Sequence, residues 1–111
     1  MYVLAEMYLF DQIDHNFFIA DLELVSQDTC RNRSLLPVAS ESECTALTGT
    51  IQAYFTGYSY DKKIDSSTFP KGCFVLLKNG TEDIEVGFFN IHSTGSIHKE
   101  AAVICRNPKG I

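Results

Sequence analysis

The chain has 111 residues, a formal net charge of −5 at pH 7 and 45% hydrophobic residues. This composition is typical of one ordinary globular domain rather than of a disordered chain. The lysines and arginines are few and scattered, so the chain lacks the basic face with which nucleic-acid-binding proteins neutralise phosphates, and we expect no nucleic-acid partner.

The first segment, "MYVLAEMYLFDQID", combines large apolar residues with Glu6, Asp11 and Asp14. It predicts a short helix or an extended arm that other groups must cover on more than one side. It lacks the basic start and the cleavage site of a signal peptide, and it is too short to span a bilayer. We therefore divide the chain into an apolar arm, residues 1–15, and a single domain, residues 16–111.

The next segment, "NFFIADLELV" at residues 16–25, is rich in β-forming residues. It predicts one strand with Asp21 and Glu23 on the solvent face. The polar residues that follow, up to Pro37, predict a loop.

A capping box at Ser40 and Glu43 predicts the start of a helix. The Ser40 hydroxyl can accept the N–H of Glu43, and the Glu43 carboxylate can accept the N–H of Ser40. The helix would end near Gly57, although Gly49 weakens it by about 1 kcal/mol. One face of this helix would carry Cys44, Leu47, Ile51, Tyr54 and Phe55.

The second half of the chain predicts mainly strands. Residues 56–72 form a long polar connection, and residues 74–78 and 84–90 are the arms of a hairpin around Asn79-Gly80. Residues 92–96 predict another turn, and residues 101–106 a last strand. The predicted fold is therefore α+β, with one helix packed on a small antiparallel sheet.

Four cysteines, Cys30, Cys44, Cys73 and Cys105, are well spaced and form no C-x-x-C pair. A zinc site normally needs a short ligand pair, so we expect no metal, and an even cysteine count favours two disulfides. Four cysteines allow three pairings, and the sequence by itself does not choose one. We favour Cys44–Cys73, which would pin the helix onto the sheet, leaving Cys30–Cys105 to close the ends of the domain.

A thiol-redox protein is the alternative use of these cysteines. Cys44 lies in the first turn of the predicted helix, where a thiolate is stabilised. No resolving cysteine lies nearby in the sequence, and we rank this alternative below the disulfides.

The remaining polar residues give no catalytic pattern. Ser93 and His92 are neighbours that would point to opposite faces of a strand, and the carboxylates near the hairpin tip are expected to be solvated. Asp61 and Asp65 match no calcium loop. We therefore expect no enzyme activity, no catalytic residue and no cofactor.

Three tyrosines, Tyr54, Tyr58 and Tyr60, lie in or beside the polar connection. Aromatic rings on a loop can stack on sugars or on a partner protein. The alternative is that they cover the helix end and the edge of the sheet. A secreted module that recognises carbohydrate or protein through residues 54–69 is therefore a second hypothesis for the function.

Several short motifs follow one another over residues 30–106. They are Ser40-x-x-Glu43-Cys44-x-Ala46, Phe69-Pro70-Lys71-Gly72-Cys73, Gly87-Phe88-Phe89-Asn90, Gly95-Ser96 and Ile104-Cys105-Arg106. In this order they resemble a small four-cysteine domain of uncharacterised proteins from microalgae and other marine protists. The resemblance implies an algal origin and a compartment that permits disulfides, and it implies no catalytic residue.

An apolar arm on a stapled domain in such a compartment suits a structural or interaction protein. The thylakoid lumen and the extracellular space are the expected locations. We expect an accessory subunit of a larger algal assembly, for example on the lumenal side of a photosystem–antenna complex, that does not itself span the membrane. Other protein subunits would cover the arm through Tyr2, Leu4, Met7, Tyr8 and Phe10.

Overall fold

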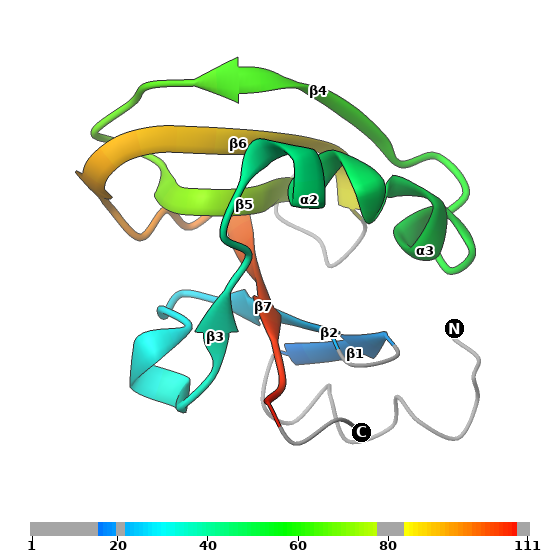
Figure 1. The fold of residues 1–111 in the computed structure, drawn as a ribbon, viewed down its shortest axis with the longest axis horizontal. Helices are drawn as coiled ribbons and strands as arrows, with labels where there is room; N and C mark the ends of the chain where they lie inside the picture. The colour runs from blue at the N-terminus through cyan, green and yellow to red at the C-terminus, as the bar shows by residue number, and fades with distance from the viewer. Residues whose placement is uncertain (1–15, 20–21, 78–83, 109–111) are drawn as a thin grey trace.

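The computed structural model describes the backbone of residues 16–19, 22–77 and 84–108, and the side chains of the last two ranges. Helices and strands alternate irregularly along the chain (Figure 1). In order they are β1 (Asn16–Ile19), β2 (Leu22–Ser26), the 3-10 helix η2 (Arg31–Arg33), β3 (Leu36–Pro37), α2 (Glu41–Ala46), α3 (Thr48–Gln52), β4 (Ser59–Ile64), β5 (Pro70–Leu77), β6 (Ile84–Gly95) and β7 (Ala101–Arg106).

All the described strands belong to one seven-stranded sheet with the order β1-β2-β7-β5-β6-β4, to which β3 adds by pairing with β7. β7 joins the two halves of this sheet, because β2 pairs along one of its edges while β5 and β3 share the other. Figure 1 shows β7 running from the upper layer of β4, β5 and β6 to the lower layer of β1 and β2. Every strand pair is antiparallel except β4 with β6.

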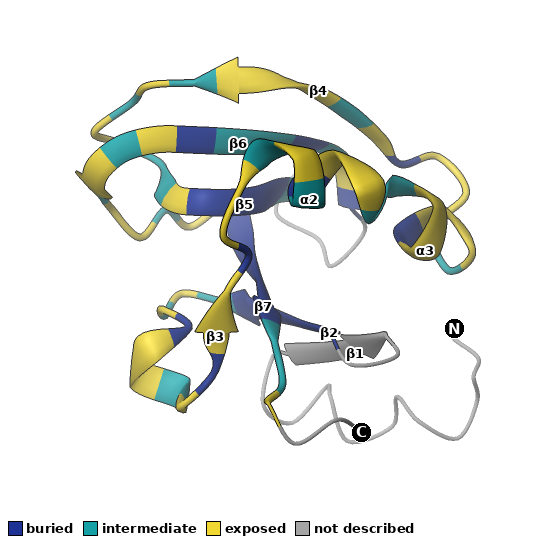
Figure 2. Ribbon diagram, in the orientation of Figure 1, coloured by how far each residue is buried: buried dark blue, intermediate teal, exposed yellow. Residues whose placement is uncertain are grey.

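The main core lies on the face of the sheet that α2 and α3 cover. Alternate residues of β2, β5 and β7 point into it, together with Cys44, Ile51 and Tyr58 from the covering segment. A smaller cluster on the opposite face joins Val25, Val103 and Cys105 to Cys30 and Leu35. Figure 2 shows the consequence, since β2, β5 and β7 are mostly buried whereas β4 is largely exposed.

The predicted α+β class is confirmed, as are the hairpin strands over β5 and β6 and the last strand, β7. The predicted single strand over residues 16–25 is wrong, since the chain reverses between Ile19 and Leu22 to pair β1 with β2. Glu23 is buried, not on a solvent face. The reason is that β2 is an interior strand, on which Glu23 lies opposite Cys105 of β7.

The predicted helix begins where the capping box places it but breaks at Leu47 and ends at Gln52, before Gly57. The Ser40 hydroxyl accepts the N–H of Glu43 at 3.2 Å, as predicted. The Glu43 carboxylate accepts the N–H of Ala39, not that of Ser40. Gly49 and the threonines on either side of it are poor helix formers, which explains two short helices in place of one long helix.

Two stretches that the sequence predicts as connections are strands. Residues 59–64 form β4, an edge strand that pairs in parallel with β6, so the sheet is mixed rather than wholly antiparallel. The polar sequence of β4 does not indicate a strand, because an edge strand that faces solvent needs little apolar surface. Lys62 and Lys63 on this edge disfavour pairing with a strand of another chain. Residues 92–95 continue β6 through an irregularity opposite Lys71.

Candidate functional site: a cleft between β3 and β5

Two disulfides fix segments to opposite faces of the sheet. Cys44–Cys73 joins α2 to β5 on the main-core face, and Cys30–Cys105 joins the residue before η2 to β7 on the other face. Both predicted pairings are confirmed. All four cysteines are at most 5% exposed, which limits the access of an attacking thiolate to the sulfur atoms.

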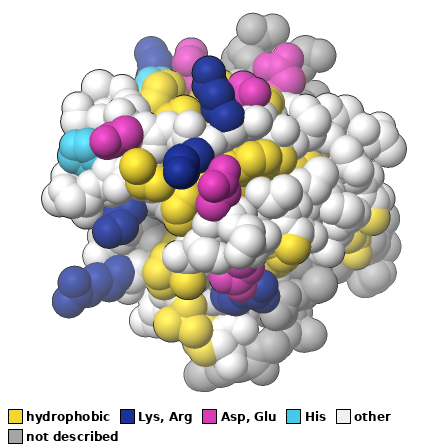
Figure 3. All heavy atoms as spheres, turned by 45° about the horizontal axis from the view of Figure 1, so that its top comes forward, with side chains coloured by type: hydrophobic (Ala, Val, Ile, Leu, Met, Phe, Trp, Pro, Cys, Tyr) yellow, Lys and Arg dark blue, Asp and Glu magenta, His cyan; other side chains and the backbone are white. Residues whose placement is uncertain are grey.

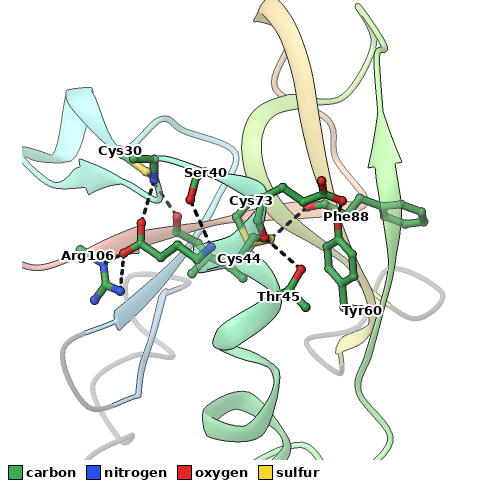
Figure 4. Close-up of a disulfide and its surroundings, with 12 residues drawn as sticks. Cys30, Ser40, Cys44, Thr45, Tyr60, Cys73, Phe88 and Arg106 are labelled. Carbon is green, nitrogen blue, oxygen red and sulfur yellow. Dashed lines mark hydrogen bonds and ion pairs between the residues drawn. A yellow bond between two sulfur atoms is a disulfide. The ribbon is translucent and has the colours of Figure 1, made fainter.

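The start of α2 is bound to β7 as well as to β5. The Glu43 side chain reaches both the Ala39 N–H and the Arg106 side chain. Figure 4 shows Arg106, with the dashed lines that mark its contacts, in the same view as Ser40 and the Cys44–Cys73 disulfide. The Ala39 N–H, and more weakly Arg106, hold the pKa of Glu43 below its usual 4.5, against a smaller opposing effect of burial. The segment from β3 to α2 is thereby held at both ends.

A cleft of about 700 Å³ opens where β3 and β5 diverge. Both strands pair with the same edge of β7, β5 at Ala101–Val103 and β3 at Cys105 and Arg106. The segment before η2 and the end of β3 form one wall, and the start of β5 and the end of β6 form the other. The lining is mostly apolar and comprises residues 28–31, 37–39, 70–72, 89–91 and 94–97 together with Val103.

Asn90 anchors the β5–β6 wall. Its side chain is 1% exposed, and its amide makes five hydrogen bonds to the backbone. The oxygen accepts the N–H groups of Ser66 and His92, and the nitrogen donates to the carbonyls of Ser66, Phe69 and Pro70. The buried Asn90 side chain thus supplies hydrogen bonds to the backbone of residues 65–70, where the regular hydrogen bonds between strands are lacking.

Gly95 lets the end of β6 cross close to the start of β5. It has φ +62°, and a Cβ at this position would lie 2.6 Å from the Lys71 nitrogen and from the Phe69 carbonyl oxygen. No other residue type fits that approach without moving the backbone. The Lys71 ammonium donates to the Ser93 carbonyl at 3.1 Å, so the position of this lysine on the cleft is fixed from two sides.

The charges that line the cleft are unequal. Arg31 and Lys71 are exposed, and neither forms an ion pair with another described residue. Asp28 is the one acidic residue of the lining, and its carboxylate already accepts the Thr29 N–H and the Asn32 amide and faces Arg33 at 3.9 Å. The Thr29 hydrogen bond, followed by that of Asn32, holds the pKa of Asp28 below its usual value. The residues that line the cleft therefore carry a net positive charge.

Exposed apolar side chains gather at the same place. Among the described residues the large hydrophobic side chains that lie exposed are Leu36, Ile91 and Ile97, each about half accessible. Ile91 and Ile97 both line the cleft, whereas Leu36, on β3, is not among its lining residues. Figure 3 shows one face of the molecule, on which hydrophobic side chains lie among lysines, arginines and acidic residues.

The predicted tyrosine surface is not assembled. Tyr58 is 1% exposed and lies in the main core, so it is wrong as a ligand-binding residue, and burial raises the pKa of its hydroxyl to about 12. Tyr54 and Tyr60 are half-buried against the same core. Burial, followed by the 2.8 Å hydrogen bond from the Tyr60 hydroxyl to Glu41, raises the pKa of Tyr60 to about 12. These rings cover the helices and the sheet edge.

Other predicted contact residues, Tyr2, Leu4, Met7, Tyr8 and Phe10, lie outside the described residues. Within the described ranges, no helix is long and apolar enough to cross a membrane. The same ranges hold no group of three or more His, Cys, Asp or Glu side chains that could bind a metal ion.

The sequence does not identify the cleft. Its residues come from six separate stretches. Residues 92–96, which separate Ile91 from Ile97, are polar and are interpreted as a turn. Two isoleucines in such a polar stretch are the one local signal of exposed apolar surface.

Comparison of the chain with protein-family models, with curated proteins and with solved structures finds no match. The structure does contain the two disulfides of a stapled four-cysteine domain.

Proposed function

We propose that the chain is a non-catalytic interaction protein whose cleft binds a partner protein. The observation that supports this most directly is the position of the exposed apolar side chains. Ile91 and Ile97, each about half exposed, both line the cleft, and apolar surface that a folded domain leaves exposed in one place marks an interaction site.

The frame around the cleft suits binding without rearrangement. Cys30–Cys105 fixes one wall, and Cys44–Cys73 adjoins Gly72 in the other. A surface that is already rigid loses less conformational entropy when a partner binds. Two disulfides are also compatible with an oxidising or exported compartment, which is where such a protein would work.

Exchange of Ile91 and Ile97 for aspartate tests this proposal. The tagged full-length chain and the I91D/I97D variant are each produced in the cells that make the protein, and co-purifying proteins are compared. We expect the variant to keep both disulfides and to lose a partner that the wild type retains. The matched control is Thr50→Asp, a new charge at an exposed position of α3. Identical partners for all three chains would contradict the proposal.

A finer form of the proposal is an accessory subunit of a larger algal assembly, for example at the lumenal side of a photosystem–antenna complex. It is supported by the four-cysteine motifs and by the apolar sequence of the arm, residues 1–15. Deletion of residues 1–14 should then abolish assembly while the domain still folds. Normal assembly of the truncated chain would contradict this finer form.

A further inference from the structure

We propose that the partner segment in the cleft is acidic, with carboxylates against Arg31 and Lys71 and apolar side chains against Ile91 and Ile97. This inference rests on the proposed function and names the chemistry of its partner. It commits to a short stretch of another polypeptide in which acidic and apolar residues are mixed.

The first argument is charge complementarity. The chain carries a net charge of −5, yet the cleft has two exposed cations without an ion pair among the described residues. Its single carboxylate, that of Asp28, is occupied by Thr29, Asn32 and Arg33. An acidic protein with a positive cleft attracts acidic partners there and repels them elsewhere.

A second argument is that the positive charge is built into the wall. The Lys71 ammonium is held by the Ser93 carbonyl, and the Lys71 backbone packs against Gly95 so closely that a side chain at residue 95 does not fit. An ammonium group has three N–H donors, and the described contacts use one of them. The remaining donors are available to a carboxylate of the partner.

The third argument concerns the kind of partner. Ile91 and Ile97 stand half exposed at the cleft, where a small ligand within the cleft would leave much of their surface in water. A polypeptide segment that lies across the cleft covers this apolar surface and reaches the two cations at the same time, and interfaces of this kind combine an apolar centre with a polar rim.

Selection from a displayed library of random linear peptides tests the inference with the oxidised full-length chain. We expect the wild type to enrich peptides that combine Asp or Glu with apolar residues. The R31E/K71E variant should bind these peptides at least about tenfold more weakly, since like charges then face each other, and should itself enrich basic peptides. High salt should weaken wild-type binding.

The matched control is K62E/K63E, which reverses two exposed lysines of β4 outside the cleft and changes the net charge by the same amount. Its peptide affinities should stay within about twofold of wild type, as expected for distant charges screened by salt. Equal weakening by both double variants would overturn the inference, because it would show an effect of net charge alone.

Two further outcomes would overturn the acidic partner. Enrichment of peptides that have no excess of Asp and Glu would overturn it. The proposed function would still stand in that case if the I91D/I97D variant lost the natural partner that the wild type retains. The second outcome is that no peptide binds, while dodecanoate binds tightly and dodecanol weakly. That result would assign the cleft to a small amphipathic anion.

Discussion

Gly87 of β6 lies against the ring of Tyr58, and a Cβ at position 87 would be 2.0 Å from the Tyr58 hydroxyl oxygen. Tyr58 is buried in the main core, and its hydroxyl has no hydrogen-bond partner among the described residues. The ring therefore fills the space that a side chain at residue 87 would need, and the contact joins the segment after α3 to β6.

Gly87→Ala should lower the free energy of unfolding by about 1–3 kcal/mol or more, because the added methyl overpacks a fixed ring. Tyr58→Phe should be neutral or slightly stabilising, since it removes a buried hydroxyl without a partner, and it should recover part of the loss when combined with Gly87→Ala. The control is Gly49→Ala in α3, where a Cβ meets nothing within 4 Å. It should stabilise by about 0.5–1 kcal/mol. Urea unfolding of the four variants measures these values, and a stable Gly87→Ala variant would contradict the packing.

The two disulfides should contribute unequally to stability. The two cysteines of Cys30–Cys105 are 75 residues apart in the sequence, and those of Cys44–Cys73 are 29 residues apart. The loop-entropy relation gives about 4.5 and about 3.6 kcal/mol respectively. C30A/C105A should therefore unfold at lower denaturant than C44A/C73A. A larger loss from C44A/C73A would mean that helix anchoring outweighs loop entropy.

Asn90→Ala should be among the most damaging single substitutions on the cleft. It leaves three carbonyls and two N–H groups without their partner, and each unsatisfied buried group costs about 1–3 kcal/mol. We expect a loss above about 3 kcal/mol and rapid hydrogen exchange at Ser66 and His92. Asn32→Ala, an exposed amide bound to Asp28, is the control and should cost less than about 1 kcal/mol. Similar losses at both positions would contradict the role of Asn90.

Acid should weaken the attachment of α2. The pKa of Glu43 is lowered in the folded chain from its usual 4.5, so its contribution is complete above that value and is lost as the pH falls through the folded value. Glu43→Gln should cost about 1 kcal/mol at neutral pH, and the difference from wild type should shrink as the pH falls below 4.5. Asp28, whose pKa is also lowered, is present in both proteins and does not affect this difference. A difference that is constant with pH would contradict the lowered pKa of Glu43.

The sequence predicts those features that local chemistry determines. The Ser40 cap needs one hydroxyl and one nearby N–H, and the β5–β6 hairpin follows from two apolar runs around Asn79-Gly80. The favoured disulfide pairing, one of the three that the sequence allows, rests on packing a capped helix on a sheet, and the structure has this pairing. Each of these depends on few residues that lie close together in the chain or on one simple packing step.

What the sequence does not predict depends on neighbours that are distant in the chain. Glu23 alternates like a solvent-facing residue and is buried because β1 and β7 enclose β2. β4 has too little apolar alternation to indicate a strand, and it is one because β6 offers a free edge. The cleft exists because β3 and β5 share one edge of β7, and no pattern of residues encodes that junction.

The central claim is that the disulfide-fixed cleft is where a partner binds. The most direct measurement is carbodiimide crosslinking of the protein in its native source, followed by mass spectrometry without reduction, because a carbodiimide joins an amine to a carboxylate in direct contact. The account predicts intact Cys30–Cys105 and Cys44–Cys73 bonds and a crosslink from Lys71 to an Asp or Glu of a partner chain. Free thiols, or partner crosslinks confined to Lys62, Lys63 and Lys99, would contradict it.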